Sequence, residues 1–168
     1  MRKCAFSIVL IMLLGAGGGL AVLTSGAISF RASQTPPAME TKLATMALNA
    51  SVSRHAPQQA NPYPPTEENL LRGMKLYQVG CSECHGVPGQ KNPYGDFFYP
   101  PVPQFASHGP RRSEAEIYYI VKHGVRNTGM AAWGNTIDEE QIWKISAFLN
   151  RLDSLPPPVA REWSKSPQ

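Results

Sequence analysis

The longest hydrophobic stretch of the chain lies at its start. Residues 4–30 contain no charged side chain, whereas Arg2 and Lys3 come directly before them. This run of 27 residues is long enough to span a bilayer as a helix, which takes about 20 residues. The two basic residues predict that the short N-terminal end stays inside and that the rest of the chain is exported. We therefore expect residues 1–30 to be a retained membrane anchor or a signal peptide that is cleaved near Ala27.

The segment that follows, residues 31–65, has a different composition. It is rich in Gln, Pro, Ala, Ser and Asn, contains few large apolar residues, and ends in Asn-Pro-Tyr-Pro-Pro at residues 61–65. Because proline resists helix formation and favours extended backbone, we expect a disordered or loosely structured spacer here. The pattern leaves open whether this spacer is a tether that lets a domain move at a membrane surface or simply low-complexity sequence.

Beyond the spacer, hydrophobic positions recur with the spacing of an α-helix. A first helix is predicted over residues 66–79, where Thr66 is a suitable N-cap and two glutamates follow it at the positive end of the helix dipole. A second helix is predicted to begin at Ser113, which forms a capping box with Glu116, and to stop at Gly124. The long segment between them is rich in glycine, proline and aromatic residues, and is expected to be a loop.

A third helix is predicted from another capping box, formed by Thr136 and Glu139. Its apolar stripe consists of Ile142, Ile145, Leu149 and Leu152. Three prolines at residues 156–158 end the pattern, and no segment of the sequence alternates like a β-strand. We therefore expect an all-α domain over residues 66–155, followed by a proline-rich tail at residues 156–168.

The distribution of charge and the small size of the predicted domain limit the functions that the protein can have. The chain has a net charge of +4, but residues 66–153 hold nine basic and ten acidic residues and are nearly neutral. The excess positive charge lies in the leader and the spacer, and no basic stripe with interleaved aromatics is present, so we do not expect a nucleic-acid partner. Such a short domain has difficulty building a sufficient core from its own side chains, and a buried cofactor would supply further apolar contacts.

The sequence Cys81-Ser-Glu-Cys84-His85 has the spacing of a covalent haem attachment site. Two thiols on one helical turn can be attached to the two vinyl groups of a haem, and the imidazole that follows can reach the iron from the same side. A redox dithiol would be expected beside a β-α-β pattern, which is absent. A zinc site would need further ligands. The remaining cysteine, Cys4, is expected on the other side of the membrane, and His108 and His123 are left as candidates. A disulfide between the two cysteines is the remaining alternative.

A haem iron with two axial ligands needs a second side chain, usually methionine or histidine. Met130 is the only methionine after Cys84 and lies in a glycine-bounded loop between two predicted helices. Such a loop can fold over the opposite face of a haem from His85, although a methionine can also fill a hydrophobic core. His123 falls in the last turn of a predicted helix, where cations are favoured, and His108 falls in a loop; both are weaker candidates.

These features resemble the class I cytochromes c of bacteria over about residues 66–155. Besides the haem-binding motif, three stretches carry the resemblance: Gly73-x-x-x-Tyr77, HGVRNTGMAAWG at residues 123–134, and DEEQIWKISAFL at residues 138–149. The resemblance implies a cytochrome c fold, with three to four helices around one covalently bound haem c. It also implies that the first and last helices cross where Gly73 and Tyr77 meet the region of Trp143.

The resemblance further implies the roles of individual residues. Cys81 and Cys84 would hold the haem, and His85 and Met130 would be the axial ligands of its iron. The carbonyl of Pro100 or Pro101 would accept a hydrogen bond from the other ring nitrogen of the ligand histidine, which orients the ring. Aromatic residues in the two loops would surround the haem: Phe97, Phe98, Tyr99, Phe105 and Trp133.

An iron with two protein ligands has no open position for a substrate, so the sequence predicts an electron carrier rather than an enzyme. Its partners would be redox proteins: an oxidase, a reductase, a quinol-oxidising complex or a dehydrogenase. The alternatives are a fixed haem subunit of a larger membrane redox complex and a haem enzyme or gas sensor in which Met130 is labile. We expect the domain on the periplasmic side of the bacterial cytoplasmic membrane, anchored by residues 1–30, or soluble in the periplasm after cleavage near Ala27.

Overall fold

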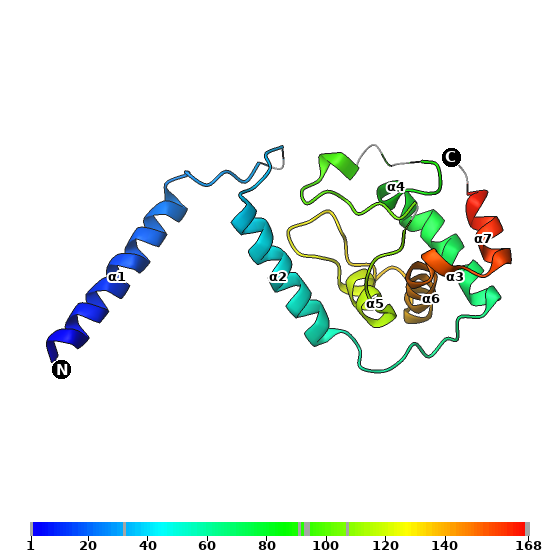
Figure 1. The fold of residues 1–168 in the computed structure, drawn as a ribbon, viewed down its shortest axis with the longest axis horizontal. Coiled ribbons are helices and arrows are strands. Elements are labelled where there is room, and N and C mark those ends of the chain that lie inside the picture. The colour runs from blue at the N-terminus through cyan, green and yellow to red at the C-terminus, as the bar shows by residue number, and fades with distance from the viewer. Residues whose placement is uncertain (1, 32, 91, 93–94, 107, 167–168) are drawn as a thin grey trace. The chain divides into compact units, whose positions relative to one another are not determined.

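The computed structural model describes residues 2–31, 33–90, 92, 95–106 and 108–166, and the described part of the chain contains helices and no β-strand. The α-helices are α1 (Arg2–Thr24), α2 (Ala38–His55), α3 (Glu67–Gly80), α4 (Ser82–His85), α5 (Glu114–His123), α6 (Glu139–Asn150) and α7 (Pro157–Ser164) (Figure 1). Two short 3-10 helices lie at Gly95–Phe97 and Leu152–Ser154. The predicted all-α fold class is confirmed.

The chain divides into two compact units, Met1–Gln34 and Thr35–Gln168. Most of the first unit is α1, in which Phe6–Thr24 has a mean hydropathy of 2.3. This stretch is long and apolar enough to cross a membrane. A signal peptide has the same properties, so both fates predicted for the N-terminal segment are consistent with this helix.

The second unit is built around the crossing of α3 and α6. Gly73 lies at the crossing point, where a Cβ atom would overlap the backbone carbonyl of Lys144. The crossing therefore requires glycine at this position. One turn further along α3, the ring of Tyr77 packs against Phe148 with 5.8 Å between ring centroids. Trp143, next to Lys144, stacks on Tyr118 of α5 at 4.2 Å. The crossing that was predicted between the first and last helices of the domain is present between α3 and α6.

The helix ends follow the predicted capping patterns in two of three cases. The Thr66 hydroxyl accepts a hydrogen bond from the Asn69 amide, and Ser113 and Glu116 form a reciprocal capping box at the start of α5. The box predicted from Thr136 and Glu139 is wrong. Asp138 caps α6 together with Gln141, because a carboxylate with a glutamine three residues later makes the same reciprocal pair of bonds two residues further along the chain. The Thr136 hydroxyl instead donates to the Trp133 carbonyl.

The prediction of a loosely structured spacer at residues 31–65 is also wrong, because α2 occupies 18 of these residues. The prolines that suggested a spacer lie on either side of the helix, and the stretch between them contains neither proline nor glycine. The helix is held by the side chain of Val52, which is 1% exposed. It is held also by Asn49, whose side-chain oxygen accepts a 2.6 Å hydrogen bond from Arg112.

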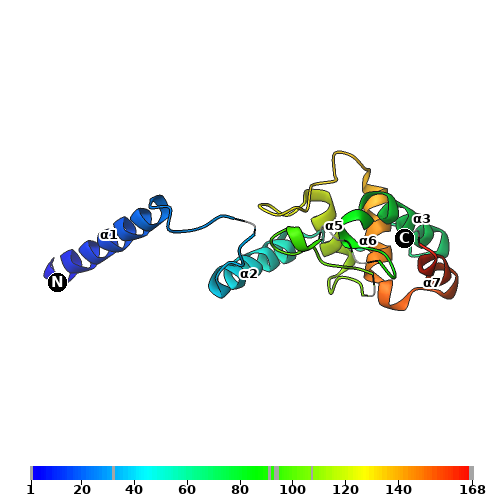
Figure 2. The same ribbon diagram turned by 90° about the horizontal axis from the view of Figure 1, so that it is seen from above.

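The predicted proline-rich tail at residues 156–168 contains a further helix. In α7, Val159 is 0% and Trp163 is 6% exposed, and the Trp163 ring lies 5.6 Å from Tyr77 and 5.2 Å from Phe148. The prolines occupy the N-cap and first turn of α7, where no intrahelical amide donor is needed. Figures 1 and 2 both show α7 beside α3. Val159 and Trp163 of α7 are therefore part of the hydrophobic core.

Candidate functional site

The Cys-x-x-Cys-His motif forms one helical turn at the end of α3. Cys81 ends α3 and begins α4, and its carbonyl accepts hydrogen bonds from the amides of Cys84 at 3.1 Å and His85 at 2.9 Å. Gly86 ends the turn with a φ of +77°, a conformation that favours glycine. The buried hydroxyl of Tyr77 donates to the Gly86 carbonyl at 2.7 Å. The motif is thus joined at both ends to the core helix α3.

The two thiols are free, with Cys81 half-buried and Cys84 exposed. Burial, and to a lesser extent the neighbouring Cys84, raises the pKa of the Cys81 thiol to about 12. This thiol is therefore protonated at neutral pH. A redox dithiol needs an attacking thiol of lowered pKa, and Cys81 does not supply one.

The zinc alternative finds no support among the residues that the structure describes. No three of their His, Cys, Asp and Glu side chains are grouped to hold a metal ion. His108 is exposed and lies 3.3 Å from the carboxylate of Asp153. His123 is exposed at the end of α5, with its ring against Tyr119. Neither histidine completes a site with the cysteines.

His85 is held in place by the loop that leads to α5. Its Nδ1 atom lies 2.8 Å from the Pro103 carbonyl oxygen, so this nitrogen carries the proton and donates, which leaves the lone pair on Nε2. The imidazole stacks on Phe105 with a centroid distance of 4.8 Å and an interplanar angle of 7°. Burial lowers the pKa of His85, an effect that the hydrogen bond to Pro103 opposes. The ring is thus neutral and oriented, and the lone pair of Nε2 is available to bind a metal.

The prediction that Pro100 or Pro101 binds the histidine ring is corrected to Pro103. The Phe105 amide donates to the His85 carbonyl at 2.7 Å. This bond fixes the loop so that the carbonyl two residues earlier meets the imidazole. Spacing alone could not distinguish the three prolines, because the choice depends on this backbone pairing.

Gln104 is a site residue that the sequence analysis missed. Its side-chain nitrogen donates to the Cys84 carbonyl at 3.0 Å, and its side-chain oxygen accepts from the Asn92 amide at 3.1 Å. Gln104 therefore links the turn of the cysteine motif to the backbone at Asn92, at the start of the loop that follows. Nothing in the local sequence distinguishes this glutamine from a surface residue.

Met130 lies in a tight turn after α5. Gly124 ends the helix with a φ of +68°, and the Val125 amide donates to the Met130 carbonyl at 3.0 Å. Within the turn, the Thr128 hydroxyl donates to the Val125 carbonyl and accepts from the Met130 amide, at 2.8 and 3.1 Å. Met130 itself is half-buried and packs against the core. The turn is therefore ordered by its own hydrogen bonds.

Two contacts bring the Met130 turn to the cysteine motif and its loop. A Cβ atom on Gly129 would lie 2.6 Å from the ring of Phe98, so this ring packs directly on the turn. A Cβ atom on Gly80, the residue before the motif, would lie 3.4 Å from the ring of Trp133. Residues that are far apart in the sequence, Phe98 with Gly129 and Gly80 with Trp133, thus meet in the fold.

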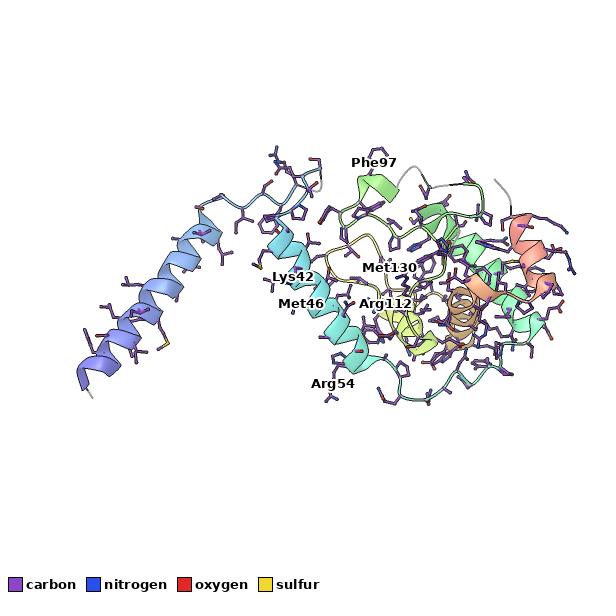
Figure 3. The ribbon with its side chains drawn as sticks, viewed as in Figure 1. Lys42, Met46, Arg54, Phe97, Arg112 and Met130 are labelled. Carbon is purple, nitrogen blue, oxygen red and sulfur yellow. The ribbon has the colours of Figure 1, made fainter. Side chains whose placement is uncertain are left out.

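The aromatic residues that were expected around the haem lie in different surroundings. Phe105 stacks on His85 and Phe98 packs on the Met130 turn, as described above. Phe97 is 76% exposed and projects outward from its loop (Figure 3). The Tyr99 hydroxyl is directed to α2, where it lies 3.0 Å from the hydroxyl of Thr41.

Comparison with known proteins identifies this region. A family model described as cytochrome c oxidase, cbb3-type, subunit III, matches residues 68–149. The match begins in α3, ends in α6, and includes the cysteine motif and the Met130 turn. This stretch is a class I-like c-type cytochrome domain. Such a domain binds haem c covalently, with iron as its metal, and its function is haem-mediated electron transfer.

Solved structures include a chain that is similar to this one. It belongs to the reducing HAO-like protein complex of Kuenenia stuttgartiensis, is 23% identical, and aligns with a TM-score of 0.47. The aligned region covers 57% of the present chain and 50% of that chain, so the match spans about half the length of the relative. No curated protein matches the chain.

Proposed function

We propose that the domain carries single electrons through one haem c that is attached to Cys81 and Cys84 and ligated by His85 and Met130. The observation that carries this proposal is the oriented imidazole of His85, which follows two free thiols on a single helical turn. With Nδ1 bound to the Pro103 carbonyl, Nε2 is the nitrogen left for a metal. When bound, the haem iron supplies a one-electron oxidation–reduction couple.

The residues present fit this cofactor. The thiols of Cys81 and Cys84 are held on a turn whose backbone is fixed by its own hydrogen bonds, which suits two bonds to one planar group. The neutral imidazole meets the requirement that a histidine ligand be deprotonated at the metal-binding nitrogen. The thioether of Met130 comes from a separate ordered turn, and thioether ligation raises the reduction potential of haem iron.

Ligation by both His85 and Met130 would leave the iron no open position. This supports a carrier rather than a haem enzyme or gas sensor. Electron exchange would then depend on brief contact with redox partners, such as an oxidase, a reductase, a quinol-oxidising complex or a dehydrogenase. The second candidate function is a fixed haem subunit of a larger membrane complex, and it is favoured by the matching family model, whose description names an oxidase subunit.

The apolar helix α1 supports a location at a membrane. We propose that it anchors the chain and that the haem domain lies on the periplasmic side, with a soluble periplasmic protein as the alternative if the leader is cleaved near Ala27. Absorption spectra of membrane and soluble fractions distinguish the two, because a covalent c-type spectrum should appear in the membrane fraction. Recovery of the haem only in the soluble fraction would contradict the anchor.

Spectra of the holoprotein also test the ligands. The oxidised protein should show the far-red methionine–iron band, and the reduced protein should not change when carbon monoxide is added. Met130→Ala should remove the band and allow carbon monoxide to bind. Met39→Ala, at an exposed methionine of α2, is the matched control and should do neither. A large carbon monoxide effect on the unmodified protein would reject the carrier in favour of an enzyme or sensor.

Mass spectrometry of the denatured chain tests the attachment. The unmodified chain should carry the mass of one haem, and the double variant Cys81→Ala, Cys84→Ala should carry none. Extraction in mild detergent then separates the two functional candidates. Copurification with other subunits in fixed ratio would favour the complex subunit, whereas a monomeric haem protein would favour the carrier.

A further inference from the structure

Helix α2 lies outside the stretch that matches the cytochrome family model, yet it is fastened to the haem domain at several points. Its buried contact is Val52, and Ala56 directly after the helix is 8% exposed. The ring of His55 stacks on Tyr119 of α5, with a centroid distance of 6.1 Å and an interplanar angle of 17°. The Asn49 side chain binds Arg112 just before α5. The C-terminal half of α2 is thus fixed along α5.

The N-terminal half of α2 makes a different contact. The hydroxyls of Thr41 and Tyr99 are 3.0 Å apart, although the residues are separated by 58 positions. Figure 3 labels Lys42 and Met46 in this half of the helix. Together with the first residues of α2, Tyr99 also lines a shallow, mainly apolar groove. The helix therefore contacts the loop between the haem-binding motif and α5.

This loop connects α2 to both proposed axial ligands. Phe98, the neighbour of Tyr99, packs on Gly129, the residue before Met130. A few positions later, Pro103 binds the ring of His85. The loop of residues 98–105 is consequently in contact with α2, with the Met130 turn and with the histidine.

We propose that α2 braces the axial ligands, with Thr41 and Tyr99 as positioning residues that hold the loop of residues 98–105 against the Met130 turn. The proposal rests on the proposed function, because it assigns Met130 to the iron. A short polar turn opens locally at low cost when few contacts cover it. The ring of Phe98 covers this turn, and the Thr41–Tyr99 hydrogen bond keeps that part of the loop in place. Releasing the bond raises the fraction of molecules in which Met130 is off the iron.

The experiment uses the full-length holoprotein and two variants that each remove one hydroxyl, Thr41→Val and Tyr99→Phe. Thr45→Val is the matched control, since Thr45 lies one turn further along α2 and beside the same groove. Amide hydrogen exchange is measured over residues 98–105 and 124–131. Loss of one hydrogen bond should speed exchange in both stretches about 2- to 10-fold. The double variant should exchange no faster than either single variant, because both remove the same bond.

Carbon monoxide binding to the reduced holoprotein provides a second measurement. Carbon monoxide can bind only while Met130 is off the iron, so the unmodified protein should take it up only over long incubation. This slow uptake should become faster by the same factor in Thr41→Val and Tyr99→Phe and should stay the same in Thr45→Val. If both variants show the same hydrogen-exchange rates and carbon monoxide binding rates as Thr45→Val, the proposal that α2 braces the axial ligands is rejected.

The two proposals can fail separately. Should the unmodified protein lack the methionine–iron band, the ligand assignment of Met130 is rejected. The exchange measurement still decides whether α2 restrains the two loops, because it does not depend on the iron. Faster exchange at the Met130 turn supports that restraint, and unchanged exchange rejects it.

Discussion

The two helices that flank the cytochrome stretch, α2 and α7, differ in how they are attached to the same domain. The shorter one, α7, has 8 residues and inserts Val159 and Trp163 fully into the core. The longer one, α2, has 18 residues but buries only Val52 within the helix. Three of its large apolar side chains, Met39, Leu43 and Met46, are more than half exposed. Helix length therefore does not measure how much a segment contributes to the core.

The difference predicts two kinds of response to mutation. Trp163 packs against Tyr77 and Phe148, which belong to the crossing helices α3 and α6, so a change there should affect global unfolding. The contacts of α2 are made with α5 and with loops, so changes there should mainly affect local opening. The predictions below test this distinction in order of decreasing effect.

Trp163→Ala should have the largest effect. Truncating a buried tryptophan leaves a cavity and should lower the free energy of unfolding by about 3–5 kcal/mol. Denaturant unfolding of the holoprotein measures this loss, and Trp163→Phe should recover much of it by refilling part of the space. A loss below about 1 kcal/mol would mean that α7 is not part of the core in solution.

Val52→Ala should be less severe. Removing two buried methyl groups should cost about 1.5–2 kcal/mol, and the loss should appear mainly as faster proteolysis around α2. Limited proteolysis and denaturant unfolding of the same sample distinguish local from global loosening. The comparison fails if this variant lowers the free energy of unfolding as much as Trp163→Ala.

Asn49→Ala should have a smaller effect still, because it removes one exposed hydrogen bond to Arg112 and should cost about 1 kcal/mol or less. Asn150→Ala is the matched control, since the Asn150 side chain donates to the Arg112 carbonyl from α6. Limited proteolysis should detect loosening of α2 in Asn49→Ala alone. Equal cleavage of α2 in both variants would show that the Asn49 contact does not fasten the helix.

Glu162→Gln should have the smallest effect. A hydrogen bond from Lys165, together with the charge of that residue, lowers the pKa of the Glu162 carboxyl below its ordinary value of 4.5. Since the folded-state pKa is the lower one, any stabilisation is present above about pH 4.5 and disappears as the pH falls through the lowered value. Both side chains are exposed, so the melting temperatures of variant and unmodified protein should nearly coincide at neutral pH. A clear difference there would mean that charge, and not burial, holds α7.

Two errors in the sequence predictions, the spacer and the tail, have a common origin. Prolines at both borders of α2 and at the start of α7 suggested a spacer and a tail, yet proline is compatible with the positions just outside a helix and in its first turn. Whether such a segment then folds depends on a partner surface. For α7 that surface is formed by Tyr77 and Phe148, which lie far away in the sequence.

The same distinction between local and long-range contacts applies to the candidate haem site. Features that depend on near neighbours could be predicted from the sequence. They are the single turn of Cys81, Cys84 and His85, the capped starts of α3 and α5, and the stop at Gly124. Local backbone hydrogen bonds and glycine conformations involve residues only a few positions apart, so the spacing of those residues in the sequence predicts them. Three outcomes could be seen only in the folded structure: Pro103 orients the histidine, Gln104 binds the motif turn, and α2 and α7 pack on the domain. These outcomes depend on contacts between distant segments, whose geometry exists only once the chain has folded.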